Sequence, residues 1–126
     1  MRRAAILWIT VSVVYLLLGS VAYAQEEVAI VIAPKQFVLD YQGTKVTVHT
    51  NITYGDAVNE SIEMHNMDGA SIDPIAFFAD DRGFLVVKFA AEDLQKIVAP
   101  PSAELTMTGD FTAGGSFSAA DMIRVK

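Results

Sequence analysis

Apolar and polar residues alternate in several short stretches of this chain, which is the pattern of half-buried β-strands. The clearest stretch is Lys45–Ile52, where Val46, Val48, Thr50 and Ile52 fall on one face and polar side chains on the other. Successive side chains of a strand point to opposite faces, so the pattern predicts a strand with those four residues toward the core.

The densest run of large apolar side chains beyond the N-terminal segment is Phe77–Phe89, which predicts a β-hairpin at the centre of the core. Its connection is the polar segment Asp80–Gly83, in which Asp and Gly are typical turn residues. The residues of its second arm expected to be buried are Leu85, Val87 and Phe89. Lys88 has the opposite parity and is expected to point to solvent.

The same reasoning predicts strands along the rest of the chain. They are Val28–Ile32, Phe37–Leu39, Asn59–Asn66, Ser71–Ala79, Ala103–Thr108 and Phe117–Val125. Turns are expected at Asp40–Gly43 and Gly109–Ser116. Pro34 and Pro74 cannot donate to a ladder and indicate an edge position or a kink. About seven short strands with regular turns favour an all-β sandwich in one domain.

Two places depart from the alternation. Ala90–Val98 carries Leu94, Ile97 and Val98 at helical spacing, which predicts a short crossover helix that ends before Pro100. Asp121 shares the parity of the buried residues of the last strand, and a bulge or capped bend near it would resolve the conflict. We expect backbone N–H groups to satisfy its carboxylate.

The first 24 residues resemble a secretory signal peptide. Arg2 and Arg3 precede an almost wholly apolar run of about 15 residues, shorter than a spanning helix needs. Ala22 and Ala24 are the small residues of an A-x-A cleavage site, so cleavage is expected before Gln25. The alternative is an uncleaved membrane anchor. The expected mature chain is residues 25–126, with no membrane segment.

Composition narrows the classes of function. The 126 residues include no cysteine, which excludes disulfides, thiolate metal sites and a cysteine nucleophile. Removing residues 1–24 takes away Arg2 and Arg3 but no acid, so 15 acids remain against 7 bases, a net charge of −8. An acidic domain repels phosphate backbones, and binding to nucleic acid is not expected.

The C-terminal stretch contains a recognisable order of strand and turn residues. Glu104–Gly109 has the form of a strand of the type L-T-V-T-G and is followed by Gly115 and Phe117. Asp121, Ile123 and Val125 then match a closing D-x-I-x-V pattern. In these features the chain resembles immunoglobulin-like β-sandwich domains of bacterial exported proteins. The resemblance implies an immunoglobulin-like antiparallel fold and export to the periplasm or beyond; it implies no activity.

The histidines and serines form no recognisable catalytic or metal-binding motif. His49 and His65 lie in neither H-x₃-H nor H-E-x-x-H spacing, and His49 falls on the polar face of its strand. Ser71 and Ser116 lie next to glycines without forming G-x-S-x-G. We therefore expect no catalytic residue, no cofactor and no enzyme activity, with a small hydrolase as a weaker alternative.

Strand alternation predicts that three connections share one end of the sandwich. They carry Asp56, Asp80, Asp81 and Asp110, whereas Asp68 belongs to the opposite end. Such carboxylates could bind calcium or form a solvated acidic rim. Because acids are ordinary turn residues, the rim is the favoured interpretation and no metal ligand is assigned.

These observations predict an exported, non-catalytic interaction module of the cell envelope or extracellular space. Its partner would be a protein or a polysaccharide, contacted through loops or an exposed strand. The alternative is a structural subunit or spacer of an envelope assembly.

Overall fold

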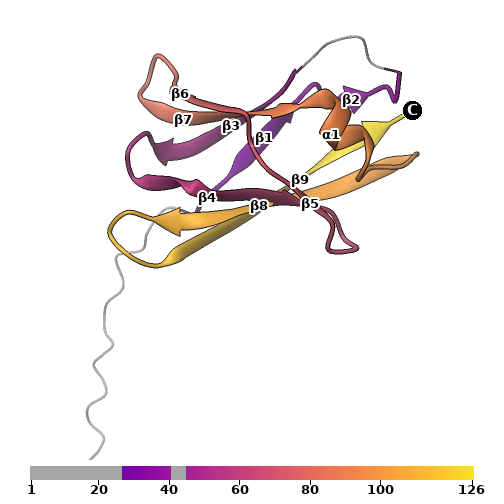
Figure 1. Ribbon diagram of the computed structural model, residues 1–126. Helices are drawn as coiled ribbons and strands as arrows, with labels where there is room; N and C mark the ends of the chain where they lie inside the picture. The colour runs from indigo at the N-terminus through magenta and orange to yellow at the C-terminus, as the bar shows by residue number, and fades with distance from the viewer. Residues whose placement is uncertain (1–26, 41–44) are drawn as a thin grey trace, which may run out of the picture.

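Two β-sheets pack face to face in a computed structural model that describes residues 27–40 and 45–126 (Figure 1). Nine strands and one short helix form within these residues, so the expected all-β class is confirmed. The strand count exceeds the expected seven because two of the nine are only two residues long. The expected signal peptide, and Tyr41–Gly43 of one expected turn, lie outside the described residues.

The first sheet has four antiparallel strands. Their order is β1 (Ile30–Ala33), β3 (Lys45–Thr53), β7 (Phe84–Ala90) and β6 (Ala76–Ala79). The alternation of Lys45–Ile52 is confirmed, since Val46, Val48, Thr50 and Ile52 are all buried.

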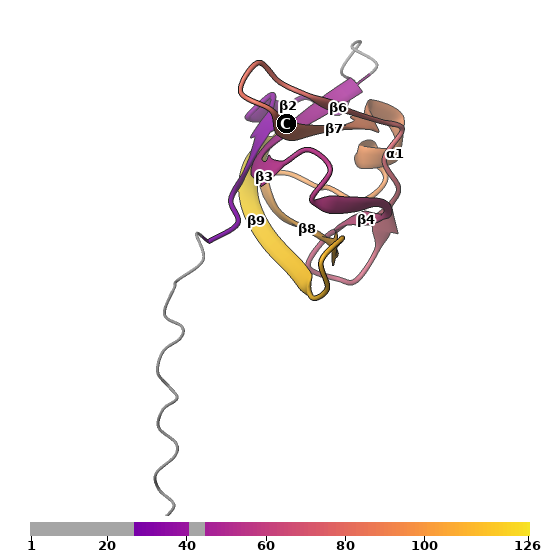
Figure 2. The ribbon, with the colours of Figure 1, turned by 90° about the vertical axis from the view of Figure 1, so that its left-hand side faces the viewer.

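The second sheet has five strands. Their order is β2 (Gln36–Phe37), β9 (Ser116–Val125), β8 (Ser102–Phe111), β4 (Ala57–His65) and β5 (Ser71–Ile72). All neighbours are antiparallel except β2 and β9, which run parallel. Figure 2 shows β9, β8 and β4 as one curved layer beneath β3, β7 and β6.

The core fills the space between the sheets and is built from both. Its largest fully buried side chains include Phe37, Ile62, Met64, Leu85, Phe89, Leu105, Met107 and Ile123. The predicted burial of Leu85, Val87 and Phe89 is confirmed. The long strands bury mainly one face, as expected for two half-solvated antiparallel sheets, although Val86 of β7 is buried on the outer face as well.

The chain changes sheets at two prolines. After Ala33–Pro34 it leaves β1 of the four-stranded sheet and continues as β2 of the five-stranded sheet. The predicted strand Ser71–Ala79 is divided in the same way, because β5 pairs with β4 whereas β6 pairs with β7. Pro74 lies in the crossing segment between them, where its missing N–H costs no ladder hydrogen bond.

The helix is shorter than its apolar spacing predicted. α1 covers Ala91–Gln95, and hydrogen bonds from Lys96 N to Asp93 O and from Ile97 N to Leu94 O tighten its last turn. Leu94 is buried, so the helix closes one side of the core between β7 and β8. Within the described residues no helix is long and apolar enough to cross a membrane.

Gly109 belongs to a strand, which corrects the predicted turn at Gly109–Ser116. β8 continues through it to Phe111, and Gly109 pairs with Phe117 of β9. A Cβ atom at position 109 would lie 2.6 Å from Cζ of Phe117 and 3.0 Å from Cγ1 of Ile62. The aromatic ring therefore occupies the space that any larger residue would need.

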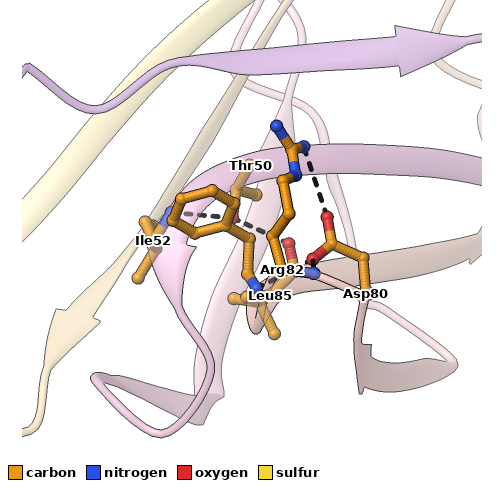
Figure 3. A network of polar contacts seen from close by, with 6 residues as sticks. Thr50, Ile52, Asp80, Arg82 and Leu85 are labelled. Atoms are coloured by element: carbon orange, nitrogen blue, oxygen red, sulfur yellow. Dashed lines mark hydrogen bonds and ion pairs between the residues drawn. The ribbon is translucent and has the colours of Figure 1, made fainter.

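Thr50 lies where the register between β3 and β7 shifts, in the segment from His49 to Thr53. Its Oγ1 donates to the Leu85 carbonyl at 2.7 Å and accepts from Ile52 N–H at 3.1 Å (Figure 3). These buried backbone groups would otherwise lack partners at the shift. The threonine is thus polar at a core position because the ladder is broken there.

Candidate functional site

The outer face of the four-stranded sheet carries an unusual row of side chains. Val31, His49, Val86 and Phe78 are successive cross-strand partners on β1, β3, β7 and β6, so all four project from one face. Val31 is 51% exposed and Phe78 is 43% exposed, while Val86 between them is buried. These four residues, called the apolar row below, span the whole sheet, with an exposed apolar side chain at each end and the exposed His49 between them.

Two lysines, Lys88 and Lys45, project from the same face as this row. Lys88 Nζ donates to Thr47 Oγ1 at 2.9 Å and lies 5.5 Å from the centroid of the Phe78 ring. Lys88 does point away from the core as predicted, but these contacts leave it half-buried rather than fully solvated. A cation over an aromatic face is held there by the ring quadrupole. Lys45 has the outward parity of His49 and is exposed.

Charge is divided unequally between the two sheets. The four strands β1, β3, β6 and β7, all inside the described part of the chain, contain Lys45 and Lys88 and no aspartate or glutamate. The acids of the five-stranded sheet are Glu60, Glu63, Glu104, Asp110 and Asp121, and its strands carry Arg124 as their one lysine or arginine. The apolar row thus lies on a basic sheet of an acidic protein.

The two histidines occupy different surfaces. His49 is exposed in the middle of the apolar row, on the solvent face predicted for it. His65 projects from β4, with Nε2 at 3.0 Å from Thr108 Oγ1 and 3.5 Å from Glu63 Oε1. The structure does not bring them together, since they belong to different sheets.

The three acidic connections do share one end of the sandwich, on the left in Figure 1. Tyr54 N donates to Gly83 O at 2.8 Å, and Thr112 N donates to Asp56 O at 2.8 Å. These bonds tie the β3–β4 loop to the β6–β7 and β8–β9 turns. The β4–β5 turn, which contains Asp68, lies at the other end, as expected.

The carboxylates of this end do not assemble into a metal site. Among residues 27–40 and 45–126 no three histidine, cysteine, aspartate or glutamate side chains are placed to hold a metal ion. Asp80 instead caps its own turn, accepting from Arg82 N at 2.8 Å and from Phe84 N at 3.0 Å (Figure 3). The Phe84 N–H above all, aided by Arg82, outweighs burial and lowers the pKa of Asp80.

Asp121 connects the two sheets. Its Oδ2 accepts from Ile32 N of β1 at 2.9 Å and pairs with Lys35 Nζ. The predicted backbone partner is therefore found, but it comes from a distant strand. The predicted bulge is wrong, because the β8–β9 register is unbroken from Ser102 to Asp110. Burial raises the pKa of Asp121, yet the Ile32 N–H and Lys35 together outweigh it, and the pKa lies below its usual value.

Two hollows lie away from the apolar row. One of about 390 Å³ lies between the β4–β5 turn and the end of α1 and is lined partly by Asn66, Lys96 and Glu104. The Asn66 amide is already engaged, donating to Ile97 O and accepting from Asp68 N and Ala70 N. The other hollow, of about 600 Å³, is a shallow depression beside Met122 and Arg124.

Sequence reasoning missed the apolar row because Val31, Val86 and Phe78 resemble core residues of strands. The signal that could have found it is the absence of acids from three predicted strands of an acidic chain, Val28–Ile32, Lys45–Ile52 and the second hairpin arm Phe84–Phe89. No protein-family model and no curated protein matches this sequence.

Proposed function

We propose that the chain is an exported, non-catalytic interaction domain with an immunoglobulin-like fold. It binds a protein partner through the outer face of the four-stranded sheet. The observation that carries the proposal is the row of Val31, Val86 and Phe78, exposed at both ends on a sheet without acids.

The strand order supports the immunoglobulin-like assignment. In that fold one sheet has the order A-B-E-D, and the other contains G-F-C, with C′ added beside C in variable types. The orders β1-β3-β7-β6 and β9-β8-β4-β5 correspond to these, if β1 is strand A. The added pairing of β2 with β9 places the continuation of the first strand on the second sheet.

Export is supported by the N-terminal pattern of Arg2-Arg3, an apolar run and Ala22-Tyr23-Ala24. A chain without cysteine is also compatible with an oxidising compartment, because no thiol can form a wrong disulfide there.

A protein partner fits the outer face better than a polysaccharide. The exposed groups are an aromatic ring and a β-branched side chain, with lysines at the margin. Interfaces of proteins combine such apolar centres with a charged rim, and aromatic residues are enriched there. The partner should present an apolar patch bordered by acids, because charge complementarity guides encounter and orientation.

Site-specific photo-crosslinking in the producing cells tests the proposal. A photoreactive residue replaces His49, which is exposed at the centre of the face, or Glu92, which is exposed on α1, as the control. We expect a covalent protein product from position 49 and none from position 92. Equal products from both positions, or none from position 49, would overturn the proposal.

A further inference from the structure

The outer face of the five-stranded sheet is curved and mainly acidic, and Arg124 of β9 is the one lysine or arginine that its strands carry. Its outward residues on β8 and β9 are small at two successive pairs, where Thr106 pairs with Ala120 and Thr108 with Ser118. Beside them Met122, which is 56% exposed, pairs with Glu104. Small residues allow close approach of another surface, and the methionine supplies a flexible apolar contact.

The charges of this face oppose those of the four-stranded sheet. Glu63 projects outward from β4 next to His65, and Glu104 and Asp110 project outward from β8. Lys45 and Lys88 occupy outward positions on the other sheet. One protein therefore carries two outer faces, one apolar and basic, the other containing an exposed methionine and acids.

We infer that the partner of the four-stranded sheet is a second copy of this chain, which stacks its five-stranded sheet on that face. This inference rests on the proposed function and names its partner. The contact joins two different surfaces, so it is heterologous, and each added copy leaves one face of each kind free. Repetition produces an open row of domains rather than a closed dimer.

The size of the face limits the contact. Four strands about 4.8 Å apart and on average about six residues long cover roughly 380 Å² per copy. A standard stable interface buries about 800 Å² per partner, so a single contact falls in the weak class. We expect a dissociation constant of about 0.1–1 mM for the isolated protein, strengthened where copies are concentrated or tethered.

Sedimentation equilibrium of the purified protein from about 0.02 to 2 mM measures the association directly. The weight-average mass of wild type should rise continuously with concentration and fall on addition of salt, which screens the paired charges. Two charge reversals test the faces separately. Lys45→Glu with Lys88→Glu alters the basic face, and Glu63→Lys with Glu104→Lys alters the acidic face.

Each double variant should bind itself at least about tenfold more weakly than wild type. An equimolar mixture of the two should regain association, because each variant retains the face that the other has lost. Asp56→Lys with Asp81→Lys is the matched control, since it changes net charge equally with the second variant, and both residues are exposed in connections at one end of the sandwich rather than on either face. The control should associate like wild type.

Phe78→Asn provides a second test if the loss of Lys88 prevents folding, because the exposed ring can be removed without changing charge. It should also weaken association at least about tenfold. A wild-type protein that stays monomeric at 2 mM, or a mixture that fails to regain association, would overturn the inference. Crosslinking of position 49 to a different polypeptide would then still support the proposed function. The absence of any product at position 49 would contradict both the proposed function and the association of copies.

Discussion

At the scale of the residue, one carboxylate, that of Asp121, links the two sheets. Asp121 projects from β9 and accepts the Ile32 N–H of β1, a pair separated by 89 positions in the chain. Ile32 is at the place where β1 ends before crossing to the other sheet. β1 is an edge strand, so the Ile32 N–H has no neighbouring strand to donate to on this side, and the Asp121 carboxylate accepts it instead.

Asp121→Ala should reduce the free energy of unfolding by about 1–3 kcal/mol at pH 7, since the Ile32 N–H loses its acceptor. The pKa of Asp121 is lowered in the folded protein, so its charged form contributes stability above the unfolded pKa of about 3.9. That contribution is lost as pH falls through the folded pKa. Urea unfolding of both proteins between pH 7 and pH 2.5 measures the difference, which should shrink at acid pH.

Asp121→Asn is the matched control, because its Oδ1 can still accept from Ile32 while the charge is lost. It should cost less than Asp121→Ala at pH 7 and have a weaker dependence on acid. A difference between wild type and Asp121→Ala that stays constant across pH would contradict the electrostatic part of this account.

At the scale of the element, the packing of β9 against β8 depends on Gly109. The Phe117 ring lies over this glycine and 5.2 Å, centroid to centroid, from the ring of Phe111. Gly109 has no positive φ, so an alanine is acceptable to the backbone. The obstacle is the side chain that would have to move.

Gly109→Ala should therefore lower the free energy of unfolding by about 1–3 kcal/mol, the usual cost of overpacking a core. The same substitution at Gly114, in the β8–β9 turn, tests a different cost, because that glycine has open space around it but a positive φ of 109°. The double variant Gly109→Ala with Phe117→Leu should recover part of the loss. Thermal or urea unfolding measures all three, and no recovery would mean that the ring is not the obstacle.

Periodicity predicted the long strands well and the short ones poorly. In β3, β7 and β9 several alternating positions separate core from solvent, and the buried residues were identified from sequence. β2 and β5 contain two residues each, too few to express a period. Their sheet is fixed by where the chain crosses, which depends on tertiary packing.

Individual residues were harder to interpret when the cause was distant in sequence. Gly109 resembles a turn residue because the ring that requires it comes from the next strand. Asp121 resembles a local bend because its partner belongs to the first strand. The shared end of the acidic loops was predicted because it follows from strand direction alone.

The whole molecule is asymmetric in charge between its two layers. Among the described residues the acids lie in the five-stranded sheet, in α1 and in the connections, whereas the strands of the four-stranded sheet have none. A uniform excess of negative charge would keep copies apart. Segregation of charge instead gives the molecule two different faces, on which both proposals for its interactions depend.

The parallel pairing of β2 with β9 has a mechanical consequence. Both strands run away from the acidic end, and the described chain begins near that end and finishes at the other. Tension applied to the two ends pulls β2 and β9 in opposite directions along their length. The bonds Arg124 N to Lys35 O, Lys126 N to Phe37 O and Leu39 N to Lys126 O are then loaded in shear and must break together.

Single-molecule pulling from the two ends should accordingly give a higher unfolding force than pulling between Ala113 and the C-terminus. The second geometry opens β9 from one end and breaks its hydrogen bonds one after another. Equal forces in both geometries would mean that β2 carries no load. A domain loaded in this way would bear tension along its length while both outer faces stay intact.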